Sequence, residues 1–549
     1  MKILYRFWVL IVISNICFFA NAQQWQWANK LGTSNSNTAI VSIEKYLGNH
    51  ILIAGSYASA NLNFGNLNLQ NSGQDDTFFA ICDNSGIYNW AVNIGGSAKD
   101  YASAIASDQN GNIYLAGNFN SLTLTVNGSS ITNSGDVDAF LIKYNPDKTF
   151  GWIRKIGGLQ KDEISAIVAN NDGNIYLTVN SPDYISLYKI STNNTILWQK
   201  NISINNQSGK STSLIIEGNQ NLYIAGGFAG KISFNGIDTI QSTKELSWIS
   251  GTYEPISNAF IAKFNSSGIY QNSVTDSNYY EINQAVFNAN AIYTCGERRN
   301  SFQVIAGPTY PQAESKIYIG KYSQSLIKEW LKTVQNADSW SKTLDIPLAI
   351  TNDENSNIYV AGLMYSNNLL FNNDTIKNIP KGFFYYSQAF VIKYNQNGDE
   401  IWYKTLGGKL NDVTTSIVVN AENNFYLAGN FESDSMLISN NLLINDSNLD
   451  SFIVHASTPV YFRKTMAFLT KFSDNSLSVN NLKPKEKYFY PNPFQSFINL
   501  FDESEYELRD LQSRLLRKGK SDIIDTKNLP KGIYLLTLNK LNTYKVIKN

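Results

Sequence analysis

Two apolar phrases alternate along most of the chain, and each occurs seven times. The first, written NIYLAG in its fullest form, ends at Gly55, Gly117, Val179, Gly226, Gly296, Gly362 and Gly429. The second, written AFLIKYN in its fullest form, begins at positions 77, 139, 185, 259, 317, 389 and 467. Short apolar runs of this kind, bounded by Gly, Asn and Asp, predict β-strands.

Each phrase belongs to a predicted β-hairpin. The segment 103–117, SAIASDQNGNIYLAG, contains two apolar runs joined by a polar turn, in which Gly111 supplies the positive φ that such turns need. The second phrase is followed, after another short turn, by a run that begins with an aromatic residue in the first six units. Each unit therefore contains four predicted strands. The aromatic residues are Trp90, Trp152, Trp198, Tyr270, Trp330 and Trp402.

Seven four-stranded units in series predict an all-β protein with a seven-bladed β-propeller over residues 23–472. The last unit lacks its fourth run, and the segment WQWANKLG at 25–32 matches such a run. We expect this N-terminal strand to complete the last blade, because closure of the ring would cover two strand edges. The regular place of the tryptophans predicts that they pack between neighbouring blades.

The N-terminus has the pattern of a secretory signal peptide over residues 1–22. Lys2 and Arg6 precede an apolar stretch at 7–19, and Ala20-Asn21-Ala22 is a cleavage site that would release the chain at Gln23. An uncleaved membrane anchor is the alternative, and it is disfavoured because a membrane span needs about 20 apolar residues.

The C-terminal segment differs from the repeats in its pattern of apolar and polar residues. Residues 473–487 are polar and predict a linker, whereas residues 488–549 contain alternating apolar runs separated by Pro, Gly and Asp. These runs predict a small β-sandwich. Four motifs follow one another in it: Tyr490-Pro491-Asn492-Pro493-Phe494, Leu508-Arg509-Asp510-Leu511, Leu529-Pro530-Lys531-Gly532-Ile533-Tyr534 and Lys545-Val546-Ile547-Lys548.

These motifs resemble the type A C-terminal sorting domain of the type IX secretion system of Bacteroidetes. Ser513 departs from the family, which usually has Gly there. The resemblance implies a secreted or outer cell-surface protein whose partner is the type IX machinery. It also implies cleavage of the tail, often with exchange for a lipopolysaccharide anchor. The implied sorting residues are Tyr490, Pro491, Asn492, Pro493, Phe494, Gly532, Tyr534 and Lys548.

The repeated phrases resemble the SBBP-type β-propeller repeat found in many exported bacterial proteins. The DxxGNIYLAG and DAFLIKYN phrases, followed by Trp and then IGG, carry this resemblance. It agrees with the fold that the spacing of the strands predicts.

The composition of the chain argues against several classes of function. Lys and Arg number 44 and Asp and Glu also 44, so no basic excess favours nucleic acid. Only His50 and His455 are present, which leaves little for His-based catalysis. Cys82 and Cys295 fall in repeats far apart around the ring, so we expect free thiols rather than a disulfide.

Three acidic residues recur at one place in the repeats. Asp100, Asp162 and Asp412 each follow a Gly-Gly pair and precede an inner-strand Ile by five positions. Blades in register would bring them to one end of the central channel, where carboxylates could bind calcium. The alternative is that each carboxylate accepts backbone hydrogen bonds in a turn. No other cofactor is predicted.

The longest predicted loops are the expected binding regions, because specificity on rigid scaffolds resides in loops. They span 229–257, 298–314, 364–387 and 431–466. We predict a non-catalytic binding protein for a glycan or a protein ligand. The alternative is an extracellular hydrolase or lyase at one channel mouth, although no acid–base pair can be named. Aromatic residues outside the repeat pattern, which could stack on a ligand, are Trp248, Tyr310, Trp340, Tyr385 and Tyr386.

Overall fold

The chain divides into two compact units, Met1–Asn475 and Ser476–Asn549. The predicted signal peptide and linker lie outside the residues that the structure describes, apart from Ser473 and Asp474. The computed structural model describes residues 24–33, 37–218, 221–246, 253–277, 280–288, 290–299, 315–334, 345–371, 374–378, 386–438, 441–447, 450–454, 458–462, 464–474, 489–490, 497–510, 514–538 and 542–548.

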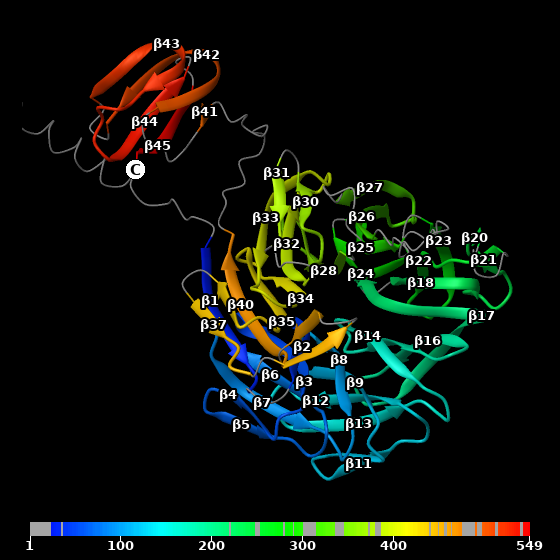
Figure 1. Ribbon diagram of the computed structural model, residues 1–549. Helices are drawn as coiled ribbons and strands as arrows, with labels where there is room; N and C mark the ends of the chain where they lie inside the picture. Colours follow the sequence, from blue (N-terminus) through cyan, green and yellow to red (C-terminus); the bar gives the residue numbers. More distant parts are fainter. Residues whose placement is uncertain are drawn as a thin grey trace, which may run out of the picture. The chain divides into compact units, whose positions relative to one another are not determined.

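The first unit is a β-propeller, as the sequence predicts. Its sheets follow one another around a ring, and the chain colours run around that ring from blue to orange (Figure 1). Apart from one short 3₁₀ turn, Leu47–Asn49, every regular element that the structure describes is a β-strand. We number the repeats 1–7 in chain order.

Repeats 1, 2, 5, 6 and 7 each form a four-stranded antiparallel sheet. The strands, in sheet order from the inner strand outward, are β2 (Thr38–Tyr46), β3 (His50–Tyr57), β6 (Asp76–Cys82) and β7 (Tyr88–Ile94); β8 (Asp100–Ser107), β9 (Ile113–Phe119), β12 (Asp138–Tyr144) and β13 (Phe150–Ile156); β24 (Glu281–Asn288), β25 (Ala291–Arg299), β26 (Ser315–Ser323) and β27 (Lys328–Val334); β28 (Ile346–Asn352), β29 (Ile358–Met364), β32 (Gln388–Tyr394) and β33 (Glu400–Leu406); and β34 (Asp412–Val419), β35 (Asn424–Phe431), β40 (Met466–Ser473) and β1 (Gln24–Leu31).

Repeats 3 and 4 share one eight-stranded sheet. Its strand β17 spans Ile196–Glu217, pairing first with the third strand of repeat 3 and then acting as the inner strand of repeat 4. The segment between the second and third strands of repeat 3 is short, and residues 231–233 at the end of β18 continue the pairing with β17 as far as Ser203. The strands are β14 (Glu163–Ala169), β15 (Ile175–Asn180), β16 (Tyr184–Ile190), β17, β18 (Asn221–Ser233), β19 (Ile240–Gln241), β22 (Asn258–Asn265) and β23 (Tyr270–Asp276).

The N-terminal strand closes the ring as predicted. Strand β1 runs antiparallel to β40, from the pair Gln24 and Ser473 to the pair Leu31 and Ala467. The blue and orange strands lie side by side in Figure 1. Trp25 on β1 packs edge-on against Phe472 on β40, with ring centroids 4.9 Å apart.

Within the described residues, repeats 1, 2, 6 and 7 each have a small hairpin directly after their second long strand. One face of each hairpin is buried in the propeller core, for example through Leu62, Leu124, Leu369 and Met436. Parts of the predicted loops 364–387 and 431–466 are therefore packed hairpins. The hairpins are β4–β5 (Asn61–Phe64, Leu67–Gln70), β10–β11 (Thr123–Val126, Ser129–Thr132), β30–β31 (Asn368–Phe371, Asp374–Lys377) and β36–β37 (Ser435–Ile438, Asn441–Ile444).

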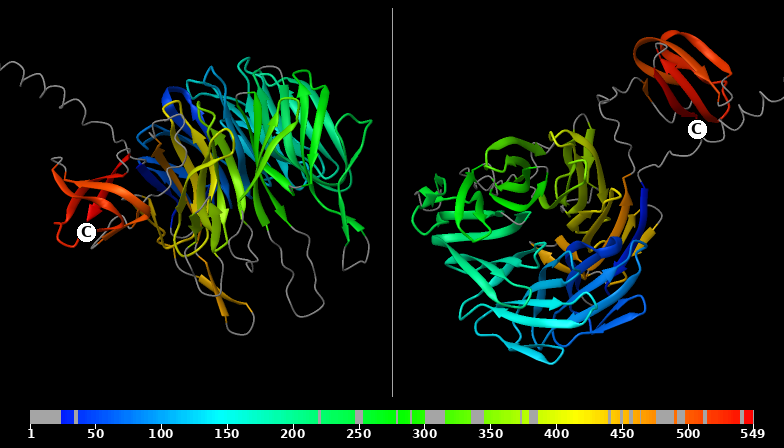
Figure 2. Two further views of the ribbon diagram at one scale, coloured as in Figure 1. Left: turned by 90° about the horizontal axis from the view of Figure 1, so that it is seen from above. Right: turned by 180° about the vertical axis from the view of Figure 1, so that it is seen from behind.

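Two further hairpins occur in the insertions of repeats 4 and 7. They are β20–β21 (Lys244–Leu246, Tyr253–Pro255) and β38–β39 (Asp450–Val454, Thr458–Phe462). The second of these projects from one face of the ring (Figure 2).

Tryptophans join neighbouring repeats, which confirms their predicted role. The indole N–H groups of three tryptophans donate to backbone carbonyls in a turn of the next repeat, whereas Trp330 Nε1 and Trp402 Nε1 are buried without a hydrogen-bond partner in the structure. The bonds are Trp27 Nε1 to Asn84 O (3.0 Å), Trp152 Nε1 to Thr192 O (2.9 Å) and Trp198 Nε1 to Ser266 O (3.2 Å).

Both cysteines of the propeller are buried free thiols, as predicted. Burial raises the pKa of Cys82 and of Cys295 to about 12, so both stay protonated at neutral pH. No helix in the described part of the chain is long and apolar enough to cross a membrane.

The second unit is the predicted small β-domain. Its strands form one five-stranded sheet around a core of Ile498, Leu508, Ile524, Leu536 and Val546. The strands are β41 (Phe489–Tyr490), β42 (Phe497–Arg509), β43 (Leu515–Asp525), β44 (Gly532–Leu538) and β45 (Asn542–Lys548).

Candidate functional site

The three predicted aspartates lie at the start of inner strands or just before them, where protein donors occupy their carboxylates. Asp100 is fully buried and accepts hydrogen bonds from Gly96 N and Ser121 Oγ, both at 2.7 Å. Burial raises the pKa of Asp100, and these hydrogen bonds oppose that rise. The equivalent donors are Gly158 N and Ser181 Oγ for Asp162, and Gly408 N and Ser433 Oγ for Asp412.

A fourth aspartate occupies the same place. Asp345 accepts hydrogen bonds from Tyr365 N and Ser366 N, both at 2.9 Å, and from Ser366 Oγ. No Gly-Gly pair precedes it, so the sequence search did not find it. The paired serine, 21 positions downstream, was the usable signal. Among the described residues, no group of three or more His, Cys, Asp or Glu is arranged to hold a metal ion.

Most of the predicted aromatic ligand contacts lie outside the described residues. This applies to Trp248, Tyr310, Trp340 and Tyr385. Tyr386 is described and is only 8% exposed, and its carbonyl accepts a hydrogen bond from Asn378 Nδ2 at 3.2 Å. Tyr386 therefore packs within repeat 6.

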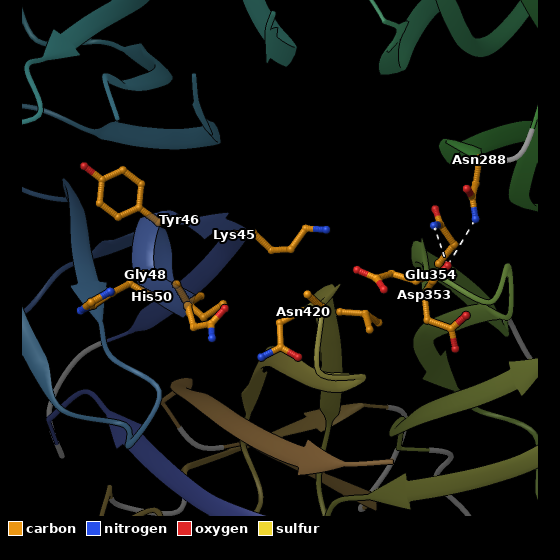
Figure 3. Close-up of a pocket in the computed structure, with 13 residues that line it drawn as sticks. Lys45, Tyr46, Gly48, His50, Asn288, Asp353, Glu354 and Asn420 are labelled. Carbon is orange, nitrogen blue, oxygen red and sulfur yellow. Dashed lines mark hydrogen bonds between the residues drawn. The ribbon is translucent and has the colours of Figure 1, made fainter. Parts of the chain in front are cut away.

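A cavity opens at the opposite end of the inner strands. It has a volume of about 400 Å³ and is lined by turns that join the first and second strands of repeats 1, 6 and 7, together with Asn288 of repeat 5. Figure 3 shows these side chains around the central space. The insertions of repeats 4–7 follow the second strand of each blade, so they leave the blades at the other end.

Two opposite charges face each other across this cavity. Lys45, at the end of β2, and Glu354, in the turn after β28, extend toward the space between them (Figure 3). Both are exposed, and within the described structure no ion pair of 4.0 Å or less joins them. Water or a ligand can therefore occupy the gap.

Asn420, in the turn after β34, also lines the cavity. Asn420 is 6% exposed, and its Oδ1 accepts hydrogen bonds from Glu422 N and Asn424 N. Its Nδ2 makes no hydrogen bond in the structure. The Nδ2 atom has essentially no exposed surface, so Asn420 holds its turn and does not reach a molecule in the cavity.

Other groups in the cavity are bound within the protein. The Asp353 carboxylate accepts hydrogen bonds from Asn357 Nδ2 and from Tyr359 OH, at 2.8 and 3.1 Å, and lies 3.7 Å from Lys393 Nζ. Asn288 Nδ2 donates to the Asp353 carbonyl at 3.3 Å. These contacts fix the shape of the wall and leave Lys45 and Glu354 to contact a ligand.

Glu44 lies beside this site on β2. Burial raises the pKa of Glu44 to about 7, and the neighbouring Lys45 charge opposes that rise. It is the only ionisable residue at its place in the seven inner strands. The equivalent residues are Ala106, Val168, Ile215, Val286, Thr351 and Val418.

The repeat pattern did not reveal this cavity, because the residues that distinguish its walls depart from that pattern. Lys45 corresponds to Ser107 in repeat 2 and to Val419 in repeat 7, and Glu354 corresponds to Ala421. Departure from the repeat was the signal that could have identified these positions.

Two predicted sorting residues fix one loop of the second unit. Tyr534 is buried, and its hydroxyl donates to Pro530 O. The Lys548 ammonium donates to Thr526 O and to Lys527 O, the latter at 3.2 Å. Gly532 begins strand β44, which follows this loop. Positions 491–494 lie outside the described residues, whereas Tyr490 pairs with Asn499 in the sheet.

Comparison with solved structures finds propellers at low similarity. Sqt1 from Chaetomium thermophilum is 8% identical with a TM-score of 0.38, and the match covers 82% of this chain and 100% of that one. A catalytically inactive virginiamycin B lyase from Staphylococcus aureus is 10% identical with a TM-score of 0.33, covering 81% and 99%. Similarity of this degree says nothing about ligand or activity. No curated protein matches the chain.

Two family models match parts of the chain. A β-propeller repeat of the SBBP family covers residues 89–121, and the secretion system C-terminal sorting domain covers residues 488–549. The sorting domain is an address for the type IX machinery. This chain is therefore a secreted or cell-surface β-propeller protein that carries an SBBP repeat and ends in a type IX C-terminal sorting domain.

Proposed function

We propose that the protein is a non-catalytic receptor that binds a small polar ligand, such as one unit of a glycan, at the channel mouth outside the cell. The carrying observation is the cavity of about 400 Å³ whose rim carries the exposed, opposite charges of Lys45 and Glu354. Ligand sites commonly occupy 300–1,000 Å³ and combine a preformed shape with a few polar groups that fix orientation.

The rigidity of the surrounding wall supports this proposal. Backbone turns held by side chains such as Asp353 and Asn420 form the rim, so the cavity exists before a ligand arrives. Preorganisation lowers the entropic cost of binding. Among the described residues, Lys45 and Glu354 form no ion pair with each other, which leaves their charges available for recognition.

A glycan array and a calorimetric screen of small polar compounds on the purified full chain test the proposal. We expect selective binding that Glu354→Ala or Lys45→Ala weakens at least tenfold. Lys409→Ala is the matched control, because Lys409 is exposed beyond the other end of the inner strands. Binding that survives both cavity variants would move the site to the insertions of repeats 4–7.

A hydrolase or lyase is the second candidate. One observation favours it: Glu44, beside the cavity, has a pKa of about 7, which suits a general acid or base near neutral pH. Incubation of any bound glycan with the wild type and with Glu44→Gln decides between the two. Turnover that Glu44→Gln abolishes would replace the receptor proposal.

Export through the sorting domain has a separate test. Deletion of residues 488–549 is expected to leave the protein inside the cell envelope. We propose that Tyr534 and Lys548 act by shaping the loop 526–530, so Lys548→Met should reduce export while the propeller stays folded. Cleavage after Ala22 and attachment to lipopolysaccharide are further predictions that N-terminal sequencing and mass spectrometry of the exported protein would test.

A further inference from the structure

We propose that the two hairpins in the insertion of repeat 7, β36–β37 and β38–β39, bind a second copy of this chain. The outer face of β36–β37 packs against the second copy, and an edge of β38–β39 pairs with the same edge of that copy. This inference does not depend on the cavity or its ligand, because the insertion leaves the blade at the other end of the inner strands.

The outer face of β36–β37 is apolar. Leu437, Leu442 and Ile444 are 64%, 56% and 53% exposed, and Leu437 pairs directly with Leu442 across the two strands. The residues that alternate with them, such as Met436 and Leu443, are buried in the propeller core. Three large apolar side chains on one exposed face form a patch, unlike the single apolar residues that are normal on protein surfaces.

The hairpin of repeat 1 shows that this fold does not require an apolar outer face. Its strands β4 and β5 have the same alternation of buried and exposed residues and the same pairing. Its exposed residues at the places of Leu437, Leu442 and Ile444 are polar. They are Asn63, Asn68 and Gln70.

The hairpin β38–β39 starts close to this patch and extends away from the ring. Asp450, its first residue, follows Ile444 by six positions, and Asn445 Nδ2 donates to Lys464 O at 2.9 Å, which joins the two ends of the insertion. Among the described strands, β38 and β39 pair only with each other, and they project from one face of the ring (Figure 2). Both edges of this hairpin are therefore open to another strand.

The composition of β38–β39 favours such pairing. Its ten strand residues, DSFIV and TPVYF, include six apolar residues and a single charge, Asp450. The other hairpin that pairs only within itself, β20–β21, has the residues KEL and YEP, of which three are charged. Charged residues on a free edge prevent pairing with other copies, and an isolated hairpin is only marginally stable in water. The hairpin of repeat 7 lacks the protection that β20–β21 has.

A second copy fits this surface because identical edges match each other. Two copies related by a two-fold axis bring the same edge together antiparallel, with the same residues contributed by each copy. The patch lies beside the start of the hairpin and extends the contact area. Ten strand residues and three patch residues are fewer than the roughly 20–30 that a standard interface uses on each side. We therefore expect a weak dimer that forms as the protein concentration rises.

Sedimentation equilibrium of the purified full chain, at concentrations up to about 100 µM, tests the proposal. We expect a monomer–dimer equilibrium. The triple variant Leu437→Asn, Leu442→Asn, Ile444→Gln carries the residues of repeat 1, so its fold should be kept while the Kd of the dimer rises at least tenfold. Ile237→Asn is the matched control, because Ile237 is an apolar residue of repeat 4 that is 85% exposed. A wild type that remains monomeric at the highest concentration would overturn the proposal.

Hydrogen exchange measures the contribution of β38–β39 separately. The amides of 450–454 and 458–462 should exchange more slowly at concentrations above the Kd than at concentrations tenfold below it. This difference should vanish in the triple variant, whose melting temperature should equal that of the wild type. Exchange that does not depend on concentration, or a dimer that the triple variant leaves as tight as the wild type, would contradict the proposed interface.

Discussion

The two ends of the inner strands differ in what their polar side chains do. At one end, Asp100, Asp162, Asp345 and Asp412 are buried and receive hydrogen bonds from Gly and Ser groups of the same protein. At the other end, Lys45 and Glu354 extend into a cavity and form no ion pair with each other within the described residues.

This difference suggests how to interpret a repeat protein. A residue that recurs at equivalent places makes the same packing or hydrogen-bond contact in each blade. Its recurrence therefore indicates a role in the stability of the fold. A residue that differs from those at the equivalent places in other blades makes no contact that all blades need. It is therefore the better candidate for ligand recognition. The aspartates belong to the first class, whereas Lys45, Glu354 and Glu44 belong to the second.

The largest expected effect concerns a buried ion pair that occurs where the repeat ends. Lys393 Nζ lies 2.6 Å from Asp474 Oδ2, and both side chains are almost fully buried. Elsewhere the equivalent lysine donates to a turn, as Lys263 does to Gln324 O at 3.2 Å. The last blade has no such turn because its fourth strand comes from the N-terminus, and the Asp474 carboxylate takes the place of that carbonyl.

Lys393→Met should therefore lower the free energy of unfolding by roughly 3–5 kcal/mol, because it leaves two buried carboxylates without their cation. Lys471→Met is the matched control, since Lys471 hydrogen-bonds only the neutral Asn84 side chain and should cost about 1–2 kcal/mol. Urea denaturation measures both. Equal losses would show that the buried charges do not govern this position.

The recurring aspartates come next in expected size. Asp412→Ala removes the acceptor of Gly408 N and of Ser433 Oγ, at 2.7 and 2.6 Å, inside a buried site. We expect a loss of roughly 2–3 kcal/mol in the free energy of unfolding. Asp136→Ala, at an exposed position, should change stability by less than about 0.5 kcal/mol.

The effect of calcium on thermal stability tests the alternative role of the aspartates, in which they form a metal site. If Asp412 belonged to a calcium site, added calcium would raise the melting temperature of the wild type and leave that of Asp412→Ala unchanged. Insensitivity of both to calcium and to EDTA would leave the carboxylates as structural acceptors.

Much of the fold follows from the repeats because local and global preferences agree. Gly117 shows why the glycine recurs: a Cβ atom there would lie 2.5 Å from Tyr101 O, and 2.5 Å from the Phe140 ring. Repeat 3 has Val179 instead, and the residue at the place of that Phe is Ser186. Loss of the glycine and loss of the ring occur together, which is a packing rule that the sequence already contains.

The cavity could not be predicted in the same way. Its walls come from turns of repeats 1, 6 and 7 and from Asn288, and only ring closure brings these close together. Equally, repeats 3 and 4 merge through the long strand β17, which pairs with strands of both repeats. Both features arise from long-range packing, which apolar spacing does not report.

The third prediction concerns Glu44, because the equivalent place in each of the other six repeats holds an uncharged residue. Its folded-state pKa of about 7 exceeds the value of 4.5 expected in the unfolded chain. The folded protein therefore binds more protons between these values, and stability is greatest below pH 4.5 and falls as pH rises through 7. We expect this fall to be roughly 2 kcal/mol, allowing for partial access to water.

Glu44→Gln should remove that part of the pH dependence. Urea denaturation of both proteins at intervals between pH 4.5 and pH 8 measures it, and the two curves should converge at the acidic end. Parallel curves would mean that Glu44 ionises as a water-exposed carboxyl does.

The smallest expected change in stability tests the comparison most directly. Lys45→Ala and Glu354→Ala remove exposed charges that form no ion pair with each other within the described residues, so each should alter the free energy of unfolding by less than about 0.5 kcal/mol. The two ends of the inner strands would then differ several-fold in their sensitivity to the loss of a charged side chain. A loss of 2 kcal/mol or more from either variant would assign the cavity charges to the fold, and with it remove the reason to seek a ligand for them. Unchanged stability together with lost binding would show that the residues that depart from the repeat are those that serve recognition.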